Sequence, residues 1–282
     1  MHTHRPGPFS LSGRCTVTPV VNEAGRNRGG RQHIPRPPRT RLGGAAPWAE
    51  VPAERRRLSL ADIRARCADL PPPPRLLPGG GRASAVLVPI FERDGEARLV
   101  LTKRPESMPN HPGQIAFPGG KFDPALDVTP QDAALREAQE EIGLDPATVE
   151  IVGALHPLGT VLGQFSIEPF VGVVEGVPSL IPHEWEVASV FDVAISELLS
   201  DEVFREEWWT WDEAGTERSM QFYELIGETV WGATARILTG FLAHLTGTSG
   251  PGDWQEPPIG NVWSGEPAPE GGLMETTEGP EE

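Results

Sequence analysis

The segment from residue 117 to residue 144 constrains the fold of this chain more than any other stretch. It runs from Phe117-Pro118-Gly119-Gly120 through a proline-containing loop into a helical pattern that ends before Gly143. Glycine permits unusual backbone dihedrals and close backbone approach, so a strand is expected to break into a loop at the glycine pair. Glycine is also favoured just past the end of a helix. The segment therefore predicts a strand, a loop and a helix over residues 130–142.

Three glutamates of this helix, Glu137, Glu140 and Glu141, follow the spacing i, i+3, i+4. At about 100° per residue they fall on one face, within an arc of roughly 100°. The adjacent face is apolar and would pack on a sheet; it comprises Ala134, Leu135, Ala138 and Ile142. A divalent cation such as Mg²⁺ would remove the repulsion between the clustered carboxylates. The pattern indicates a metal site, although a solvated acidic face is the commoner explanation of a bare E-x-x-E-E.

Composition divides the chain into three parts. Residues 1–81 are rich in Arg, Pro and Gly, so we expect a mostly disordered extension with a short helix near 58–69 that Ser59 caps. Residues 82–247 mix strand and helix patterns and form the expected domain. Residues 248–282 read as an acidic disordered tail.

Within the domain, periodicity predicts an α+β fold, a mixed β-sheet sandwiched between α-helices. The expected strands are 84–91, 97–104, 114–120, 149–155, 167–175, 186–193, 205–211 and 218–225. The expected helices are 130–142, 195–199 and 229–245, the last with an apolar face of Val230, Thr234, Ile237, Leu238, Phe241 and Leu242.

Charge and cysteine content exclude several classes of protein. Residues 83–246 hold 9 basic and 27 acidic residues and would repel a nucleic-acid backbone. Cys15 and Cys67 are too few for a disulfide framework and fit a reducing cytoplasm. No apolar run approaches the roughly 18 residues of a membrane span. We expect a cytoplasmic protein without nucleic-acid or membrane partners; a mitochondrial transit peptide in the Arg-rich head is the weaker alternative.

Residues 120–144 resemble the Nudix box, G-x5-E-x7-R-E-U-x-E-E-x-G-U, in which U is aliphatic. The matching residues are Gly120, Arg136, Glu137, Glu140, Glu141, Gly143 and Leu144, with Ala138 in the first aliphatic position. The loop is two residues longer than in the common box, and Asp127 is the nearest acid to the box's first glutamate. The resemblance implies a Nudix-like fold and metal-dependent hydrolysis of a diphosphate bond.

Residues 99–120, LVLTKRPESMPNHPGQIAFPGG, are similar to the signature of the coenzyme A diphosphatase branch of that family. Pro109 departs from the pattern, because many members have Arg there. Segments 182–199 and 230–238 are similar to later parts of the branch pattern. The resemblance implies cleavage of coenzyme A or acyl-CoA into 3′,5′-ADP and 4′-phosphopantetheine or its acyl form.

The resemblance also implies roles for particular residues. Glu137 and Glu141 would be the principal ligands of Mg²⁺ or Mn²⁺, Glu140 a ligand or the base for the attacking water, and Arg136 the residue that orients the carboxylates. The candidate substrate-binding residues are Arg104, His111, Gln114, Gly119 and Gly120. Glu186, expected on a neighbouring strand, is a further candidate ligand or base, against the simpler reading of an exposed carboxylate.

Two alternatives stay open at this point. The same chemistry would serve ADP-ribose, NADH or an oxidised nucleotide, and a panel of diphosphates would separate these substrates. A non-catalytic nucleotide sensor on a Nudix scaffold belongs to another class, and metal-dependent turnover would exclude it. A homodimer is compatible with either reading.

Overall fold

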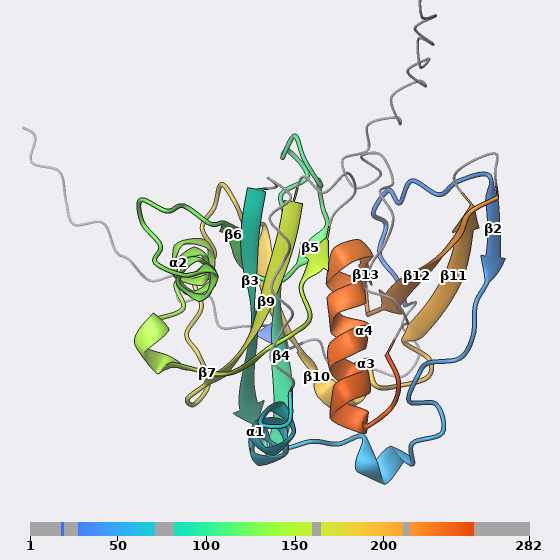
Figure 1. Ribbon diagram of the computed structural model, residues 1–282, viewed down its shortest axis with the longest axis horizontal. Coiled ribbons are helices and arrows are strands. Elements are labelled where there is room, and N and C mark those ends of the chain that lie inside the picture. Colours follow the sequence, from blue (N-terminus) through green and yellow to red (C-terminus); the bar gives the residue numbers. More distant parts are fainter. Residues whose placement is uncertain (1–17, 20–27, 71–81, 160–164, 211–214, 251–282) are drawn as a thin grey trace, which may run out of the picture.

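The computed structural model describes residues 18–19, 28–70, 82–159, 165–210 and 215–250 (Figure 1). The predicted tail beyond residue 250 lies outside these ranges. The helices are α1 (Leu60–Cys67), α2 (Pro130–Ile142), α3 (Ile195–Leu198) and α4 (Gly232–Thr246), with 3₁₀ turns at Ala53–Arg55 and Pro146–Thr148. Within the described ranges, no helix is long and apolar enough to cross a membrane.

The strands form two sheets. The larger one is mixed and has the order β1 (Thr18–Pro19), β10 (Ser189–Ala194), β4 (Glu96–Lys103), β3 (Arg82–Arg93), β9 (Phe165–Val174) and β7 (Val149–Ala154). The short strands β5 (Ile115–Ala116), β6 (Gly119–Lys121) and β8 (Leu158–Gly159) pair with β4, β3 and β9. The central strands β3 and β9 run parallel. The smaller sheet is antiparallel, in the order β13 (Thr229–Trp231), β12 (Glu217–Glu224), β11 (Phe204–Thr210) and β2 (Arg39–Leu42).

Helices cover both faces of the larger sheet. Neighbouring residues of β3 point to opposite faces, so Leu87 packs with α2 while Val88 packs in the core that α1 and α4 share. Figure 1 shows α2 on one side of β3 and β9 and α4 on the other. The predicted mixed sheet between helices is therefore confirmed.

Helix α2 has the bounds that the sequence predicts. Thr129 and Asp132 form a capping box, in which each side chain accepts a hydrogen bond from the backbone N–H of the other residue. Pro130 occupies the first helical turn, and Gly143 ends the helix with φ of 68°. These local signals agree with the burial of Ala134 and Ala138 against the sheet, so the glutamate face is fixed relative to the sheet.

Residues 28–70 correct the expectation of a mostly disordered extension. Strand β2 pairs with β11, and Trp48 is fully buried, with its ring centroid 5.4 Å from that of Phe204 and 6.4 Å from that of Tyr223. Helix α1 is capped by Ser59, as predicted. All four residues of β2 are exposed, so this strand lacks the alternation of apolar and polar residues by which strands are predicted.

Most other strand boundaries differ from the prediction by one or two residues, and three differences are larger. Thr229–Trp231 pairs with β12 as a strand, so the last helix begins at Gly232, whose φ of 68° turns the chain from strand into helix. The strand expected over 114–120 is split into β5 and β6. The strand expected from residue 186 begins at Ser189.

Candidate functional site

The glycine pair at the start of β6 lies closely between β3 and α2. A β-carbon at Gly119 would lie 2.3 Å from the backbone oxygen of Ala85, and one at Gly120 would lie 2.3 Å from Cδ of Glu137. Real β-carbons do not approach other atoms so closely, so only glycine fits at position 119, and a side chain at position 120 would displace the carboxylate of Glu137. The N–H of Gly119 donates to Oε2 of Glu141 at 3.1 Å. The strand break therefore brings bare backbone against two of the predicted carboxylates.

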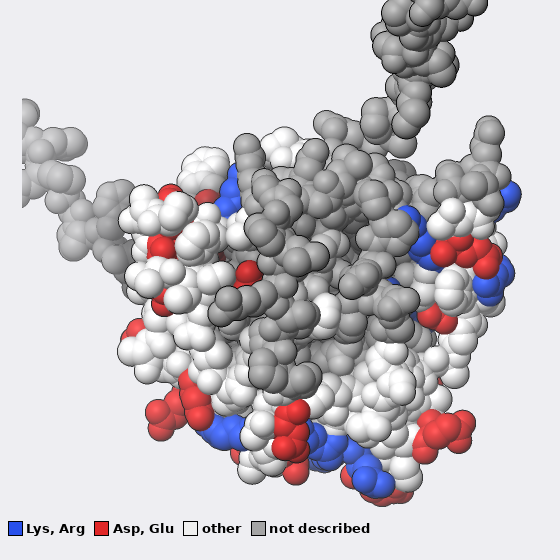
Figure 2. All heavy atoms as spheres, in the orientation of Figure 1, with Lys and Arg blue, Asp and Glu red and all other residues white. Residues whose placement is uncertain are grey.

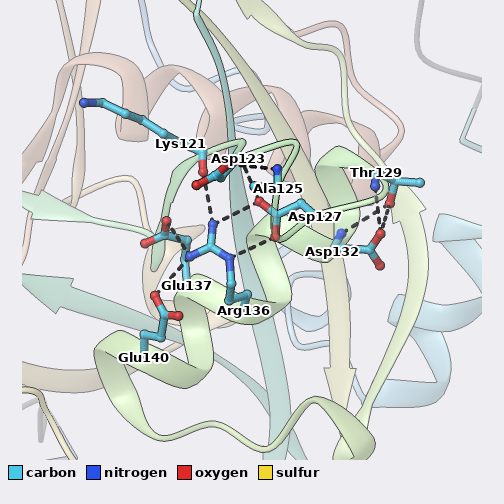
Figure 3. Close-up of polar contacts among 9 residues, drawn as sticks. All are labelled: Lys121, Asp123, Ala125, Asp127, Thr129, Asp132, Arg136, Glu137 and Glu140. Carbon is cyan, nitrogen blue, oxygen red and sulfur yellow. Dashed lines mark hydrogen bonds and ion pairs between the residues drawn. The ribbon is translucent and has the colours of Figure 1, made fainter.

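Arg136 is the centre of a hydrogen-bond network on the outer side of α2 (Figure 3). Its Nε and Nη2 donate to the two carboxylate oxygens of Asp127 at 2.9 and 3.0 Å. Its Nη1 donates to Oε1 of Glu137 and to Oε2 of Glu140, each at 3.0 Å, and Nη2 also reaches the backbone oxygen of Lys121 at 3.1 Å. One guanidinium thus joins the long loop, β6 and two glutamates, which agrees with the orienting role expected for Arg136.

Asp127 is a member of this network whose part in it the sequence did not predict. It is buried, and besides Arg136 it accepts a hydrogen bond from the N–H of Asp123 at 2.9 Å. The hydrogen bonds from Arg136 hold the pKa of Asp127 below its usual range. Since both carboxylate oxygens are engaged, Asp127 positions the arginine. The sequence offered one sign of its importance, because Asp127 is the acid nearest to the position of the missing first glutamate of the Nudix box.

The carboxylates of Glu137, Glu141 and Glu186 act on one another. The pKa of Glu141 is raised to about 7; burial is the main cause, the charges of Glu137 and Glu186 add to the rise, and the N–H of Gly119 opposes it. Burial also raises the pKa of Glu137, against the opposing effect of Arg136. Negative charge is therefore concentrated in a partly desolvated place, where a cation would be stabilised.

A cavity of about 290 Å³ opens beside these carboxylates. Its charged and glycine lining residues are Arg104, Gly119, Gly120, Lys121, Glu141 and Glu186. Five of these six were predicted, and Lys121 was not. Among the other predicted residues, Glu137 lies against the wall formed by Gly120. The side chain of Glu140 is 55% exposed and is directed at Arg136.

A short loop holds Arg104 at the cavity. The N–H of Arg104 donates to the backbone oxygen of Gln114 at 2.9 Å, and the N–H of Gln114 donates to that of His111 at 3.3 Å. His111 adopts φ of 57°, which is uncommon for a residue other than glycine. Burial, followed by the charge of Arg104, lowers the pKa of His111, so its ring is neutral near pH 7. Among the described residues, Nε of Arg104 and Nδ1 of His111 are buried without a hydrogen-bond partner.

Glu186 lies on a loop, which corrects the prediction that it comes from a strand. Its N–H donates to the backbone oxygen of His183 at 3.0 Å, and the N–H of His183 donates to that of Glu141 at 2.8 Å. The loop is thus attached to the last turn of α2. This turn keeps the backbone of Glu186 out of the sheet and places its exposed side chain at the cavity.

The donor set fits a hard divalent cation. Glu137, Glu141 and Glu186 offer carboxylate oxygens, which Mg²⁺ and Mn²⁺ prefer. Across the part of the chain that the structure describes, no group of three or more acidic, histidine or cysteine side chains is already arranged to hold a metal ion. Mg²⁺ usually keeps several waters and substrate phosphates in its shell, so an open group of carboxylates beside a cavity is the arrangement it needs. In the view of Figure 2, acidic side chains also lie at the surface over α2.

Comparison with known families identifies this arrangement. The model of the NUDIX domain matches residues 81–226. The chain belongs to the Nudix family. A protein named uncharacterized Nudix hydrolase NudL, from Photorhabdus laumondii, is 36% identical over 182 residues, which cover 64% of this chain and 95% of the relative. A NudL of Klebsiella pneumoniae is 42% identical over 146 residues, covering 51% of this chain and 73% of the relative.

Solved Nudix structures also match. The NUDIX domain of Shewanella oneidensis NrtR, crystallised with ADP ribose, has 17% identity and a TM-score of 0.34, covering 44% of this chain and 82% of that one. A MutT/nudix family protein from Enterococcus faecalis has 15% identity and a TM-score of 0.38, covering 66% of this chain and 69% of that one. The family match confirms the prediction of a Nudix hydrolase that acts on diphosphate bonds, in a family that generally uses divalent metals.

Proposed function

We propose that this Nudix hydrolase splits the diphosphate of coenzyme A or an acyl-CoA. The products are 3′,5′-ADP and 4′-phosphopantetheine, or its acyl form. The observation that supports this proposal is the meeting of Arg104, the Gly119–Gly120 backbone and Glu141 around one cavity. The segment 99–120, which resembles the coenzyme A branch, supplies both the arginine and the glycines. The resemblance therefore covers residues that line the proposed substrate site.

Glu137 and Glu141 are the principal metal ligands in this proposal, and Glu186 completes the group from its loop. Glu140 is a ligand or the base for the attacking water; its attachment to Arg136 keeps it at the rim of the site. Mg²⁺ or Mn²⁺ bound there neutralises the diphosphate and activates a water molecule.

The chain's own groups bind and orient the diphosphate. The absence of side chains at Gly119 and Gly120 lets a phosphate approach the backbone. Arg104 and Lys121 line the same cavity and provide positive charge there, and the unpartnered Nε of Arg104 is a donor for a phosphate oxygen. His111 and Gln114 lie beside Arg104 and contribute a neutral ring and an amide to the same end of the site.

The Arg136 network holds the carboxylates before substrate arrives. Because Asp127 fixes the guanidinium, the orientations of Glu137 and Glu140 follow from the loop fold. Preorganised charges cost no rearrangement during the reaction, which is why such networks accelerate it. Arg136 and Asp127 are positioning residues in this account.

The substrate is tested by comparing kcat/KM for coenzyme A, ADP-ribose and NADH. We expect coenzyme A to be preferred. Arg104→Ala should reduce kcat/KM for coenzyme A about ten- to a hundredfold more than for ADP-ribose, the effect of one charged hydrogen bond. Arg64→Ala, which removes a surface pair with Glu150, is the matched control. A wild-type enzyme that hydrolyses ADP-ribose faster at equal low concentration would overturn the coenzyme A assignment and leave the family intact.

A further inference from the structure

The walls of the cavity are of two kinds. Besides the charged residues, aliphatic residues from strands β3, β5 and β9 and from helix α4 line it. These aliphatic lining residues are Val86, Ala116, Ile167 and Ile237. A diphosphate gains nothing from contact with an aliphatic surface, so these walls fit another portion of the substrate.

The cavity walls offer little to a nucleobase. Their aromatic residue, Phe117, is only 4% exposed, so almost no ring face is available for stacking. The hydroxyls of Ser84 and Thr102 already donate to the backbone oxygens of Ser166 and Ala116, at 3.0 and 3.2 Å. An aliphatic chain, in contrast, gains from contact with the half-buried side chains of Val86 and Ile167 without needing polar partners.

Helix α4 contributes Thr234 and Ile237 to the lining of the cavity. These residues are three positions apart and therefore share one face of the helix. The sequence predicted that face as core, and the structure uses its first turns as a cavity wall. The wall thus belongs to a different element from α2, which carries the carboxylates, and it can vary without altering the metal ligands.

We infer that Thr234 is a specificity-determining residue for the non-nucleotide arm of the substrate, a mainly aliphatic chain with amide groups such as the pantetheine of coenzyme A. The arm packs on the aliphatic wall beside Thr234, and Ile237, which is only 3% exposed, supports that wall from the core. This inference rests on the proposed function, because that function supplies the arm. It adds which residue selects the arm and that the selection is made by α4.

The test compares two substrates that share a diphosphate and differ in the arm. Thr234→Phe fills the cavity, so the ratio of kcat/KM for coenzyme A to that for ADP-ribose should fall at least about tenfold, the usual effect of a mismatch in an apolar pocket. Thr234→Val keeps the shape of the side chain, removes only the hydroxyl and should lower the same ratio less. Thr246→Phe, in the last turn of the same helix, is the matched control and should leave the ratio unchanged.

The outcomes separate this inference from the proposed function. The role of α4 would be overturned if Thr234→Phe lowered kcat/KM equally for both substrates and Thr234→Val left the ratio of the two kcat/KM values unchanged. Coenzyme A would remain the substrate in that case. A wild-type enzyme that leaves coenzyme A intact would overturn the proposed function and the arm's identity with it. Competition by free pantetheine, which should weaken in Thr234→Phe and not in Thr246→Phe, gives a readout that does not depend on turnover of the diphosphate.

Discussion

Arg136 and Asp127 form a paired, two-point contact in which Nε and Nη2 of the arginine donate to the two oxygens of the aspartate at 2.9 and 3.0 Å. The third nitrogen of the guanidinium is left to hold Glu137 and Glu140. An aspartate on a lengthened loop therefore controls the direction in which the glutamates of α2 point. The pair ties the stability of the loop to the geometry of the site (Figure 3).

The Asp127 pair should make stability depend on pH in a defined direction. The pKa of Asp127 is lowered in the folded state, so the pair stabilises the fold above the unfolded pKa of about 4 and is lost as pH falls through the lower folded value. Asp127→Asn should lower the free energy of unfolding by roughly 3 kcal/mol at pH 7. Urea unfolding at pH 7, 5 and 3 measures the effect. The difference in free energy of unfolding between wild type and Asp127→Asn should become smaller toward pH 3. A difference that is the same at all three pH values would contradict the assignment.

Glu141 should show the opposite dependence in metal-free protein. Its pKa is raised to about 7, so its contribution is favourable below the unfolded value of about 4.3 and is lost as pH rises through 7. In EDTA, Glu141→Gln should therefore have a higher Tm than wild type at pH 8 and no such advantage at pH 4.5. Glu140→Gln, whose carboxylate is exposed, is the control. If the Tm values of wild type and Glu141→Gln changed with pH in parallel, Glu141 would not be a desolvated carboxylate.

Substitution of Glu137 or Glu141 should weaken metal binding, and the loss should appear both in thermal stability and in turnover. Mg²⁺ raises the Tm of any protein that binds it only when folded, so wild type should be stabilised and Glu137→Gln and Glu141→Gln should lose most of that gain. Each variant should also lose at least about a hundredfold in turnover, equivalent to about 3 kcal/mol. Glu150→Gln, at the surface, should behave as wild type. Near-normal rates in both variants would refute the metal assignment.

Residues 28–70 should be required for folding, because they complete the smaller sheet and the core. Trp48→Ala removes a fully buried ring that packs on Phe204 and Tyr223 and should cost about 3–5 kcal/mol. Trp208→Ala, whose partly exposed ring lies under Arg41, should cost less. A chain of residues 28–250 should unfold cooperatively. A chain of residues 71–250 should show no cooperative unfolding transition. A stable, active 71–250 would show that the N-terminal segment is dispensable.

The sequence predicted those elements in which local and global signals agree. Helix α2 has a capping box, a proline in its first turn, a C-terminal glycine and an apolar face, and its bounds were predicted without error. Strand β2 has none of these signals, because its four residues are exposed and it is held by backbone pairing with β11 and by the ion pair of Arg41 with Glu217. Trp48 likewise lies in a stretch without periodicity, where burial depends on a strand more than 150 positions later.

The site shows the same division. The glutamates and the glycine pair were predictable because helix spacing and a forced strand break have local causes. The sequence predicted Glu186 on a strand. Its actual position in a turn depends on hydrogen bonds to the end of α2, which the local sequence does not reveal. The contribution of Thr234 to the cavity was hidden for another reason: a helix face that lines a cavity and one that fills a core have the same apolar pattern.

Mass analysis of the products of coenzyme A and Mg²⁺ tests the central claim most directly. The account predicts 3′,5′-ADP and 4′-phosphopantetheine in equal amounts, formed by wild type, lost on addition of EDTA and strongly reduced in Glu141→Gln. Coenzyme A recovered intact, or cleaved elsewhere with release of inorganic phosphate and an undivided diphosphate, would contradict it.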